Sequence, residues 1–194
     1  ADGVKVEYYY TFGKKPDSTF DMTTLTSEDV VYWMNEWELS RVFTTGKFNA
    51  FIDQSITSIG DAAFSNCDNL TTMSIHVNVK SIGRQAFMYC SQLTTLFFGT
   101  NLNALNLCKL ESIGDYAFAG CSMQQVILPP SVTSIGRWCF YNSQELSNII
   151  FFRGSTIQTV EDYCFANCSN LSSFKFPSSV TTIGDAAFRN CTAL

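Results

Sequence analysis

From residue 57 onward, the apolar and polar positions of the chain recur in a fixed order about every 23 residues. Each unit has a short extended run, usually a Gly, a Phe-containing turn segment that usually ends in Cys, and then a second apolar run. The central phenylalanines are 23, 31, 22, 25 and 23 residues apart, and they are Phe64, Phe87, Phe118, Phe140, Phe165 and Phe188. This period predicts a solenoid, because one such unit cannot bury its own apolar side and must stack on its neighbours.

The second run of each unit predicts a β-strand with one buried side. Its apolar residues stand at the first, fourth and sixth positions, which gives the alternation typical of a strand. The expected inward residues are Leu70, Met73, Ile75, Leu93, Leu96, Phe98, Met123, Val126, Leu128, Leu146, Ile149, Phe151, Leu171, Phe174 and Phe176. We therefore expect a mostly β solenoid of about six coils, with short turns or helices between its strands.

Two of the copies carry a closer resemblance. The segments LPPSVTSIGRWCFYNSQELSNIIF (128–151) and FPSSVTTIGDAAFRNCTAL (176–194) resemble the BspA-like leucine-rich repeat, whose pattern is L-P-x-x-V-T-x-I-G-x-x-A-F-x-x-C-x-x-L-x-x-I. The resemblance covers about residues 52–194, which we expect to form the repeat array. It implies a leucine-rich repeat solenoid of the kind found in surface-exposed or secreted proteins of bacteria and protozoa. Such proteins are associated with adhesion to other cells and to host proteins such as fibronectin and fibrinogen.

The chain departs from that repeat pattern in three places. The third repeat is enlarged by about eight residues, around 99–109. Val160 and Glu161 replace the usual Ile-Gly pair, and Ser143 stands where the other units carry Cys. Insertions in solenoids form loops on one face, which is often the binding face, so the enlarged repeat is a candidate contact site. A tolerated surface loop is the alternative.

Residues 1–51 lack the repeat, and we expect them to cap the N-terminal end of the array. Residues 4–12 predict a strand. Residues 26–42 predict an amphipathic helix, with Thr26 or Ser27 as its N-cap and apolar residues at helical spacing. The expected architecture is therefore an α+β cap, with a separate small binding domain as the alternative.

At the other end, the sequence stops at Leu194, the first strand residue of the sixth repeat, without a capping segment. An uncapped apolar end favours association. We expect the array to be truncated and the parent protein to continue; closure of the last coil by another chain is the alternative.

Charge and composition narrow the classes of partner. The net charge is −5, the pI is about 4.8 and only 15% of residues are charged. Nucleic acids and anionic membranes require basic patches, so neither is an expected partner. No apolar run approaches the roughly 18–20 residues that span a bilayer, so no membrane insertion is expected within this chain.

The eight cysteines follow the repeat and do not form a metal-binding pattern. Five of them share one column and two occupy the Ala column, which indicates that the fold requires a small buried residue there. Free buried thiols and disulfides between coils remain alternatives. With one histidine, His76, and no second close cysteine pair, we expect no zinc site.

Other candidate chemistry is equally sparse. Asp61, Asp115, Asp162 and Asp185 share a column with two arginines, which argues against a calcium site and for turn chemistry and ion pairs between coils. No acid, base and nucleophile converge. We therefore expect no catalytic residues, no cofactor, no metal and no enzymatic activity.

One surface feature exceeds the needs of the repeat. The outward residue between the last two inward strand positions is Ser74, Phe97, Ile127, Ile150 and Lys175 in successive coils. Contiguous exposed apolar residues usually mark interaction sites. The predicted partner-binding set is Phe97, Ile127, Ile150, Phe152 and Lys175. The alternative is that the insertion or a second layer covers these residues.

We therefore expect a non-enzymatic protein-binding or adhesion module that contacts a protein partner over an extended solenoid face. A structural subunit of a larger assembly is the alternative. The expected partner is a host or matrix protein, or a neighbouring subunit of an assembly. The expected location is the cell surface or the secreted fraction, with a cytoplasmic location still open.

Overall fold

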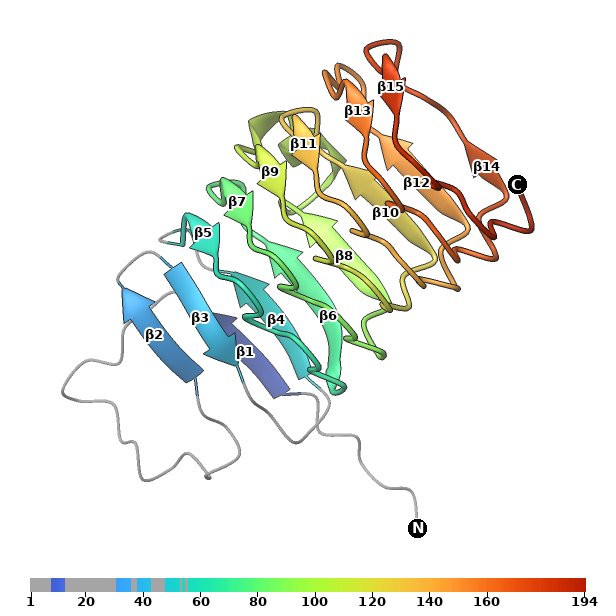
Figure 1. The fold of residues 1–194 in the computed structure, drawn as a ribbon. Coiled ribbons are helices and arrows are strands. Elements are labelled where there is room, and N and C mark those ends of the chain that lie inside the picture. The colour runs from blue at the N-terminus through green and yellow to red at the C-terminus, as the bar shows by residue number, and fades with distance from the viewer. Residues whose placement is uncertain (1–7, 13–30, 36–37, 43–47, 53, 55) are drawn as a thin grey trace, which may run out of the picture.

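The structure is a computed structural model that describes residues 8–12, 31–35, 38–42, 48–52, 54 and 56–194. These residues form a β-solenoid whose coils stack one upon the next along the chain, as Figure 1 shows. Two rows of parallel strands run along the stack, one of longer strands and one of two-residue strands. The mostly β solenoid expected from the repeat is confirmed.

The long row lies on one face of the solenoid and consists of two sheets. The first sheet has the order β1-β4-β6-β8 and the second has the order β10-β12-β14. Their bounds are β1 Tyr8–Phe12, β4 Phe48–Ile52, β6 Leu70–Ile75, β8 Thr95–Phe98, β10 Gln125–Leu128, β12 Asn148–Phe151 and β14 Ser173–Phe174.

The short row is continuous across the coils where the long row is interrupted. Its sheet has the order β11-β9-β7-β5-β3-β2, in which β2 is Val31–Asn35 and β3 is Glu38–Val42, and a separate pair joins β13 to β15. The bounds are β5 Ser58–Ile59, β7 Ser81–Ile82, β9 Ser112–Ile113, β11 Ser134–Ile135, β13 Thr159–Val160 and β15 Thr182–Ile183.

The predicted helix over 26–42 is wrong in the part that the structure describes. Strands β2 (Val31–Asn35) and β3 (Glu38–Val42) form an antiparallel pair there, and β3 continues the short row by pairing in parallel with β5. Val, Tyr and Trp in β2 favour an extended backbone, and the edge of β5 supplies hydrogen bonds that a helix would not use. No α-helix occurs among the described residues, and the described part of the expected α+β cap is β structure.

The other predictions for the N-terminal region have mixed outcomes. The strand predicted over 4–12 is present as β1 over Tyr8–Phe12, and it pairs in parallel with β4. Residues 4–7, Thr26 and Ser27 lie outside the described residues. The long row begins with strands that precede residue 52, so the sheet crosses the boundary expected between cap and array.

A column of stacked phenylalanine rings runs through the core. Phe64, Phe87, Phe118, Phe140 and Phe165 are at most 1% exposed, and successive centroids lie 5.1, 5.1, 5.6 and 5.3 Å apart. Phe188 continues the column at 5.5 Å and is partly buried. Neighbouring rings are inclined by 12° or less. Buried aromatic rings contribute large apolar area and add about 0.5–1.5 kcal/mol for each well-placed pair.

The turn beside each core phenylalanine forms a third row of backbone hydrogen bonds between coils. In the first repeat, the N–H groups of Ala62, Phe64 and Asn66 donate to carbonyls of the next coil at 2.8, 2.7 and 2.8 Å. The first and last of these residues have φ of 56° and 58°, and the same two columns have positive φ in every later repeat. Asn tolerates this left-handed conformation best among non-Gly residues, which explains why it recurs in the second column.

The cysteine column has a hydrogen-bonding role. The thiols of Cys90, Cys121 and Cys168 donate to the carbonyl of the core phenylalanine in the preceding coil at 3.0, 3.1 and 3.1 Å. Ser143 replaces Cys in the fourth repeat, and its hydroxyl donates to the Phe118 carbonyl at 2.9 Å. No disulfide joins the eight cysteines in this structure. The column therefore selects a small residue that can donate one hydrogen bond.

Close approach between coils requires glycine at the end of most short strands. A Cβ atom added at Gly114 would lie 2.6 Å from the backbone nitrogen of Arg84 in the preceding coil. Glu161 occupies this column in the fifth repeat, and there β11 and β13 do not pair. The N–H of Gly136 donates to Ile113 at 2.8 Å, but no equivalent bond links Glu161 to Ile135 in this described region. The Glu side chain thus accounts for the gap in the short row.

Removing a ring from the middle of the phenylalanine column is expected to destabilise the protein strongly. Phe118→Ala leaves a cavity between two stacked rings and is expected to lower the free energy of unfolding by about 3–5 kcal/mol. Phe188→Ala, at the partly buried end of the column, should cost clearly less. Urea unfolding followed by circular dichroism measures both, and equal losses would contradict the stacked column.

The hydrogen-bonding role of the cysteine column is testable at its natural exception. Ser143→Ala removes the donor to the Phe118 carbonyl and is expected to cost about 1–2 kcal/mol of unfolding free energy. Ser143→Cys restores the residue of the other coils and should stay within about 0.5 kcal/mol of the parent. If the two variants unfold at the same urea concentration, size alone explains the column.

The glycine column predicts opposite effects of one substitution at two equivalent positions. Gly114→Ala forces the second and third coils apart and is expected to cost about 1–3 kcal/mol. Glu161→Ala only shortens a side chain at a position that already carries a Cβ, so it should be nearly neutral. Thermal and urea unfolding of both variants would test this, and a neutral Gly114→Ala would rule out the close-approach explanation.

Candidate functional site

The structure opens a groove where the long row is interrupted. β6 pairs with β8 and β10 pairs with β12, but β8 and β10 do not pair. The same two coils remain joined through β7 and β9 in the short row. Figure 1 shows β8 and β10 in successive coils on this face of the solenoid. The opening is therefore confined to one face of the solenoid.

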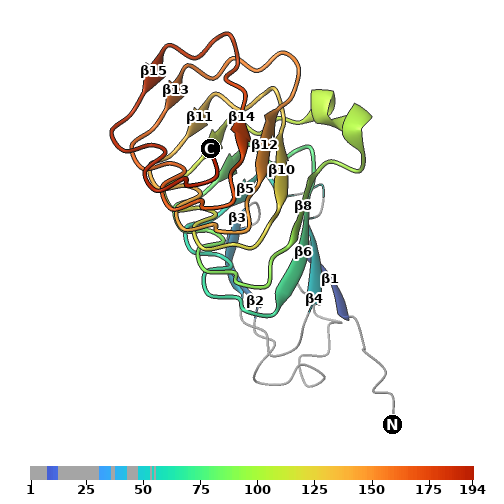
Figure 2. The ribbon, with the colours of Figure 1, turned by 90° about the vertical axis from the view of Figure 1, so that its right-hand side faces the viewer.

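The enlarged third repeat lies beside this opening. It forms a 3-10 helix, η2 (Leu102–Leu107), which projects from the strand face in Figure 2. The side chain of Asn101 caps the helix by accepting hydrogen bonds from the N–H groups of Asn103 and Ala104 at 2.9 and 3.1 Å. Ala104 and Leu105 are buried and hold the helix against the solenoid. The insertion is thus a fixed wall.

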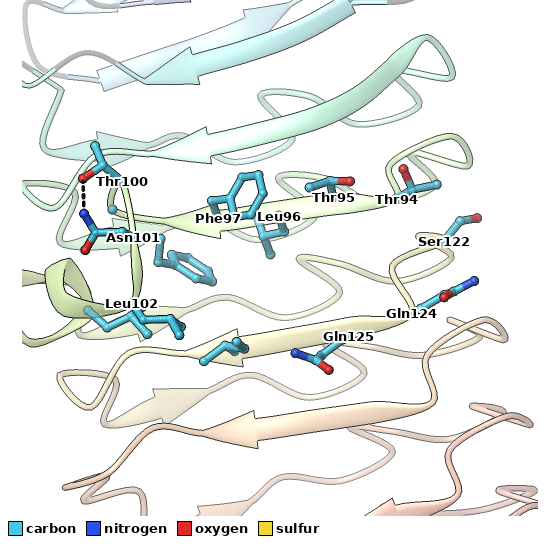
Figure 3. Close-up of a pocket in the computed structure, with 14 residues that line it drawn as sticks. Thr94, Thr95, Leu96, Phe97, Thr100, Asn101, Leu102, Ser122, Gln124 and Gln125 are labelled. Atoms are coloured by element: carbon cyan, nitrogen blue, oxygen red, sulfur yellow. Dashed lines mark hydrogen bonds between the residues drawn. The ribbon is translucent and has the colours of Figure 1, made fainter.

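The groove has a volume of about 720 Å³, within the range of ligand pockets. Its apolar lining comes from β8, from Ile127 on β10 and from η2, and the residues of β8 and η2 are Leu96, Phe97, Phe98, Leu102 and Leu105. Gly99 and threonine, serine, asparagine and glutamine residues line the remainder, and no charged side chain is among the lining residues. Figure 3 shows Phe97 and Leu96 on one strand, and Gln124 and Gln125 at the other strand across the groove.

Exposed large apolar residues gather at this site. Phe97 is 54% exposed, Leu102 is 59% exposed and Leu107 is 67% exposed. Three further exposed apolar residues of the described chain, Phe176, Ile183 and Leu194, belong to the last described coil. Tyr89, on a turn, is also exposed. Away from the last coil, the groove is thus the place where apolar exposure is concentrated.

The five residues of the predicted partner-binding set do not form one continuous line. Phe97 and Ile127 both line the groove, but they lie on different sheets. Ile150 is the register partner of Ile127, and both are partly buried. Phe152 is also partly buried, and Lys175 is exposed just beyond β14. The register pairs Ser74 with Phe97 and Ile127 with Ile150, as the outward pattern predicts, but that pattern did not predict the break between β8 and β10.

Sequence reasoning also missed part of the lining. Leu102, Leu105 and the polar residues Thr94, Ser122 and Gln125 were not among the predicted contacts. The sequence signal for the missed leucines was the 31-residue spacing between Phe87 and Phe118, which indicated the insertion but not the positions of its side chains.

The other candidate chemical groups have structural roles. Asp61, Asp115 and Asp162 each accept a hydrogen bond from a backbone N–H of the next coil, at 2.7, 2.9 and 2.8 Å. Asp162 also forms an ion pair with Arg137, with a nitrogen–oxygen distance of 3.6 Å. The Nδ1 atom of His76 accepts a hydrogen bond from the N–H of Asn78 at 3.1 Å. Among the described residues, no group of three His, Cys, Asp or Glu could hold a metal ion.

The cysteine thiols are poorly suited to nucleophilic or metal chemistry. Burial raises the pKa of Cys108 to about 11 and that of Cys168 to about 12, and it raises the pKa of Cys121 further. With these raised pKa values the thiols stay protonated near neutral pH, whereas the thiolate is the reactive and metal-binding form.

In the part of the chain that the structure describes, no helix is long and apolar enough to cross a membrane.

The stacked coils and parallel strand rows define a solenoid of the leucine-rich repeat class. The family model for the BspA type leucine rich repeat region matches six copies, over residues 43–107 and 96–194, so the chain belongs to this family. Leucine-rich repeat proteins are generally protein-interaction scaffolds, and the fold is not typically enzymatic. The family expected from the repeat sequence is confirmed.

Three solved structures illustrate the similarity. The T. pallidum leucine-rich repeat protein is 21% identical with a TM-score of 0.58, covering 81% of this chain and 82% of its own, and shows the fold alone. The pneumococcal vaccine antigen PcpA is 27% identical with a TM-score of 0.61, and a Bacteroides ovatus leucine-rich repeat protein is 25% identical with a TM-score of 0.60.

The last two matches cover 79% and 88% of this chain but only 37% and 51% of those proteins. A search of curated protein sequences finds no match.

Proposed function

We propose that the chain is a non-enzymatic adhesion module that binds a protein partner over the face of the long strand row. The contact surface consists of Phe97, Ile127, Ile150, Phe152 and Lys175, extended by the groove beside η2. The observation that carries the proposal is the exposure of Phe97 and Leu102, which both line one groove. Exposed apolar side chains in a concave, uncharged site are typical of protein contacts.

The rigidity of the scaffold supports this function. Phe97 lies on a strand that pairs with β6, and Ile127 lies on a strand that pairs with β12. Side chains fixed on paired strands lose little conformational freedom when a partner binds. Contacts distributed along several coils add to one another when the partner is extended or repetitive.

We propose the cell surface or the secreted fraction as its location. The family of the repeat supports this, as does the similarity to a structure described as a pneumococcal vaccine antigen. The partner class is a host or matrix protein, and fibronectin and fibrinogen are the first probes to test because the family resemblance points to them.

The contact surface is tested by surface plasmon resonance on immobilised fibronectin and fibrinogen. The double variant Phe97→Ser, Ile150→Ser removes apolar contacts from both sheets and is expected to weaken binding about tenfold or more. Tyr89→Asn is the matched control. It removes an aromatic residue of 44% exposure from the turn side and introduces the residue that most other coils carry there.

Unchanged affinity of the folded double variant would reject the proposed surface. Equal weakening by Tyr89→Asn would place the contact elsewhere or make it non-specific. Absence of binding by the parent protein to both probes would reject adhesion to these host proteins.

A further inference from the structure

We infer that the face of the long strand row binds a neutral, extended polysaccharide, which lies across the strands from coil to coil. This is a second class of ligand for that face, and it does not depend on the binding of a host protein. The observation behind it is a row of uncharged polar side chains that the protein itself does not use. The row runs beside the outward apolar residues Phe97, Ile127 and Ile150.

One outward position of each long strand carries a hydroxyl or an amide group in five successive coils. The register aligns Thr72 with Thr95, Gln125 with Asn148, and Asn148 with Ser173. Gln125 and Ser173 are exposed, and the other three residues are partly buried. These five residues are called the polar row below.

The polar row is not committed to the stacking of the coils. Within the described part of the chain, its five side chains make no hydrogen bond to other protein groups. The position just before it behaves differently, because the hydroxyls of Thr94, Ser147 and Ser172 donate to carbonyls of the preceding coil at 3.4, 3.0 and 3.4 Å. The stack thus uses one polar position of these strands and leaves the outward one available to a ligand.

The strands that carry the polar row are electrically neutral. None of the residues of β6, β8, β10, β12 and β14 is charged, although 15% of the whole chain is. An acidic glycan would find no cation along these strands and would lose hydration without compensation. Neutral hydroxyl groups fit better, because they both donate and accept hydrogen bonds, as the hydroxyls and amides of the polar row do.

The polar and apolar positions together match the two sides of a sugar ring. A pyranose has C–H groups on its faces, which the negative face of an aromatic ring attracts, and hydroxyls around its edge. Phe97, which is 54% exposed, and Ile127 offer the apolar contact, and Thr95 and Gln125 stand beside them on the same strands. All four residues line the groove of about 720 Å³. Figure 3 shows Thr95 and Gln125 towards one end of the strands and Leu102 towards the other.

The spacing of the coils favours a polymer that repeats at a similar distance. Neighbouring strands of a sheet lie about 4.8 Å apart, whereas a peptide strand advances by about 3.3 Å per residue and turns alternate side chains away. An extended β-1,4-linked pyranose chain advances by nearly one strand spacing per sugar. It would therefore meet one polar and one apolar position in each coil, and contacts repeated in this way add to one another.

Three soluble polysaccharides with neutral, extended β-1,4-linked backbones provide the probes: hydroxyethyl cellulose, galactomannan and arabinoxylan. Native electrophoresis through gels that contain each of them should show retardation of the protein by at least one. Oligosaccharides of the bound backbone, two to six sugars long, are then titrated by isothermal calorimetry. Affinity should rise about tenfold or more between two and four sugars and then level off, because the outward apolar residues span three coils.

A double variant tests the polar row without touching the apolar residues. Gln125→Met with Asn148→Leu removes two amides at similar side-chain volume and is expected to weaken oligosaccharide binding about tenfold or more. Gln158→Met is the matched control, since it makes the same change at an exposed residue just before β13 in the short row, and it should bind with parental affinity. The length series uses the parent protein, so it does not depend on the folding of the double variant.

The outcomes separate this inference from the proposed function. Failure of the parent protein to bind all three polysaccharides would overturn the inference, as would equal affinity for two and six sugars. Parental affinity of the folded double variant, or an equal loss in Gln158→Met, would also overturn it. Host-protein binding without polysaccharide binding would retain the proposed function alone. Polysaccharide binding without host-protein binding would retain the polar row as a site and reject adhesion to those proteins.

Discussion

The phenylalanine column sets the distance between neighbouring coils, and the other contacts depend on that distance. Rings stacked 5.1–5.6 Å apart hold successive coils close to the spacing at which parallel backbones form hydrogen bonds. Two strand rows, the turn row and the thiol-to-carbonyl bonds then form at the same spacing. Because the core phenylalanine recurs at one position in every coil, and cysteine and glycine recur at theirs in most coils, the array selects sequence by column.

The departures from the repeat mark the places where the structure differs from a uniform stack. The eight added residues around 99–109 coincide with the break between β8 and β10, and Glu161 coincides with the break between β11 and β13. Ser143, in contrast, causes no break because its hydroxyl makes the same bond as a thiol. A departure thus disturbs the stack only when it changes chain length or adds volume at a close contact.

The sequence predicted the array well because packing and pattern agree in every coil. The inward strand residues are buried in the first three coils, whereas Phe151 and Phe174 are partly buried and Phe176 is exposed in the later ones. The prediction of a helix over 26–42 was wrong in the described residues, because apolar spacing alone cannot show that an unpaired edge of β5 is available for β3. Only half of the groove was predictable: Phe97 and Ile127 follow from strand alternation, whereas the position of Leu105 depends on how the insertion folds.

The groove is open on a single side, because the remaining contacts between the same two coils are intact. Phe87 stacks on Phe118 at 5.1 Å, β7 pairs with β9, and the thiol of Cys121 donates to the Phe87 carbonyl at 3.1 Å. The unmade ladder is therefore a local property of one face, and the walls of the groove are held in place before any partner arrives. A site whose edges are already fixed and unpaired avoids most of the ordering cost of binding. In this solenoid, the insertion lies beside the unmade ladder between β8 and β10, whereas the core stack of the same two coils is unchanged.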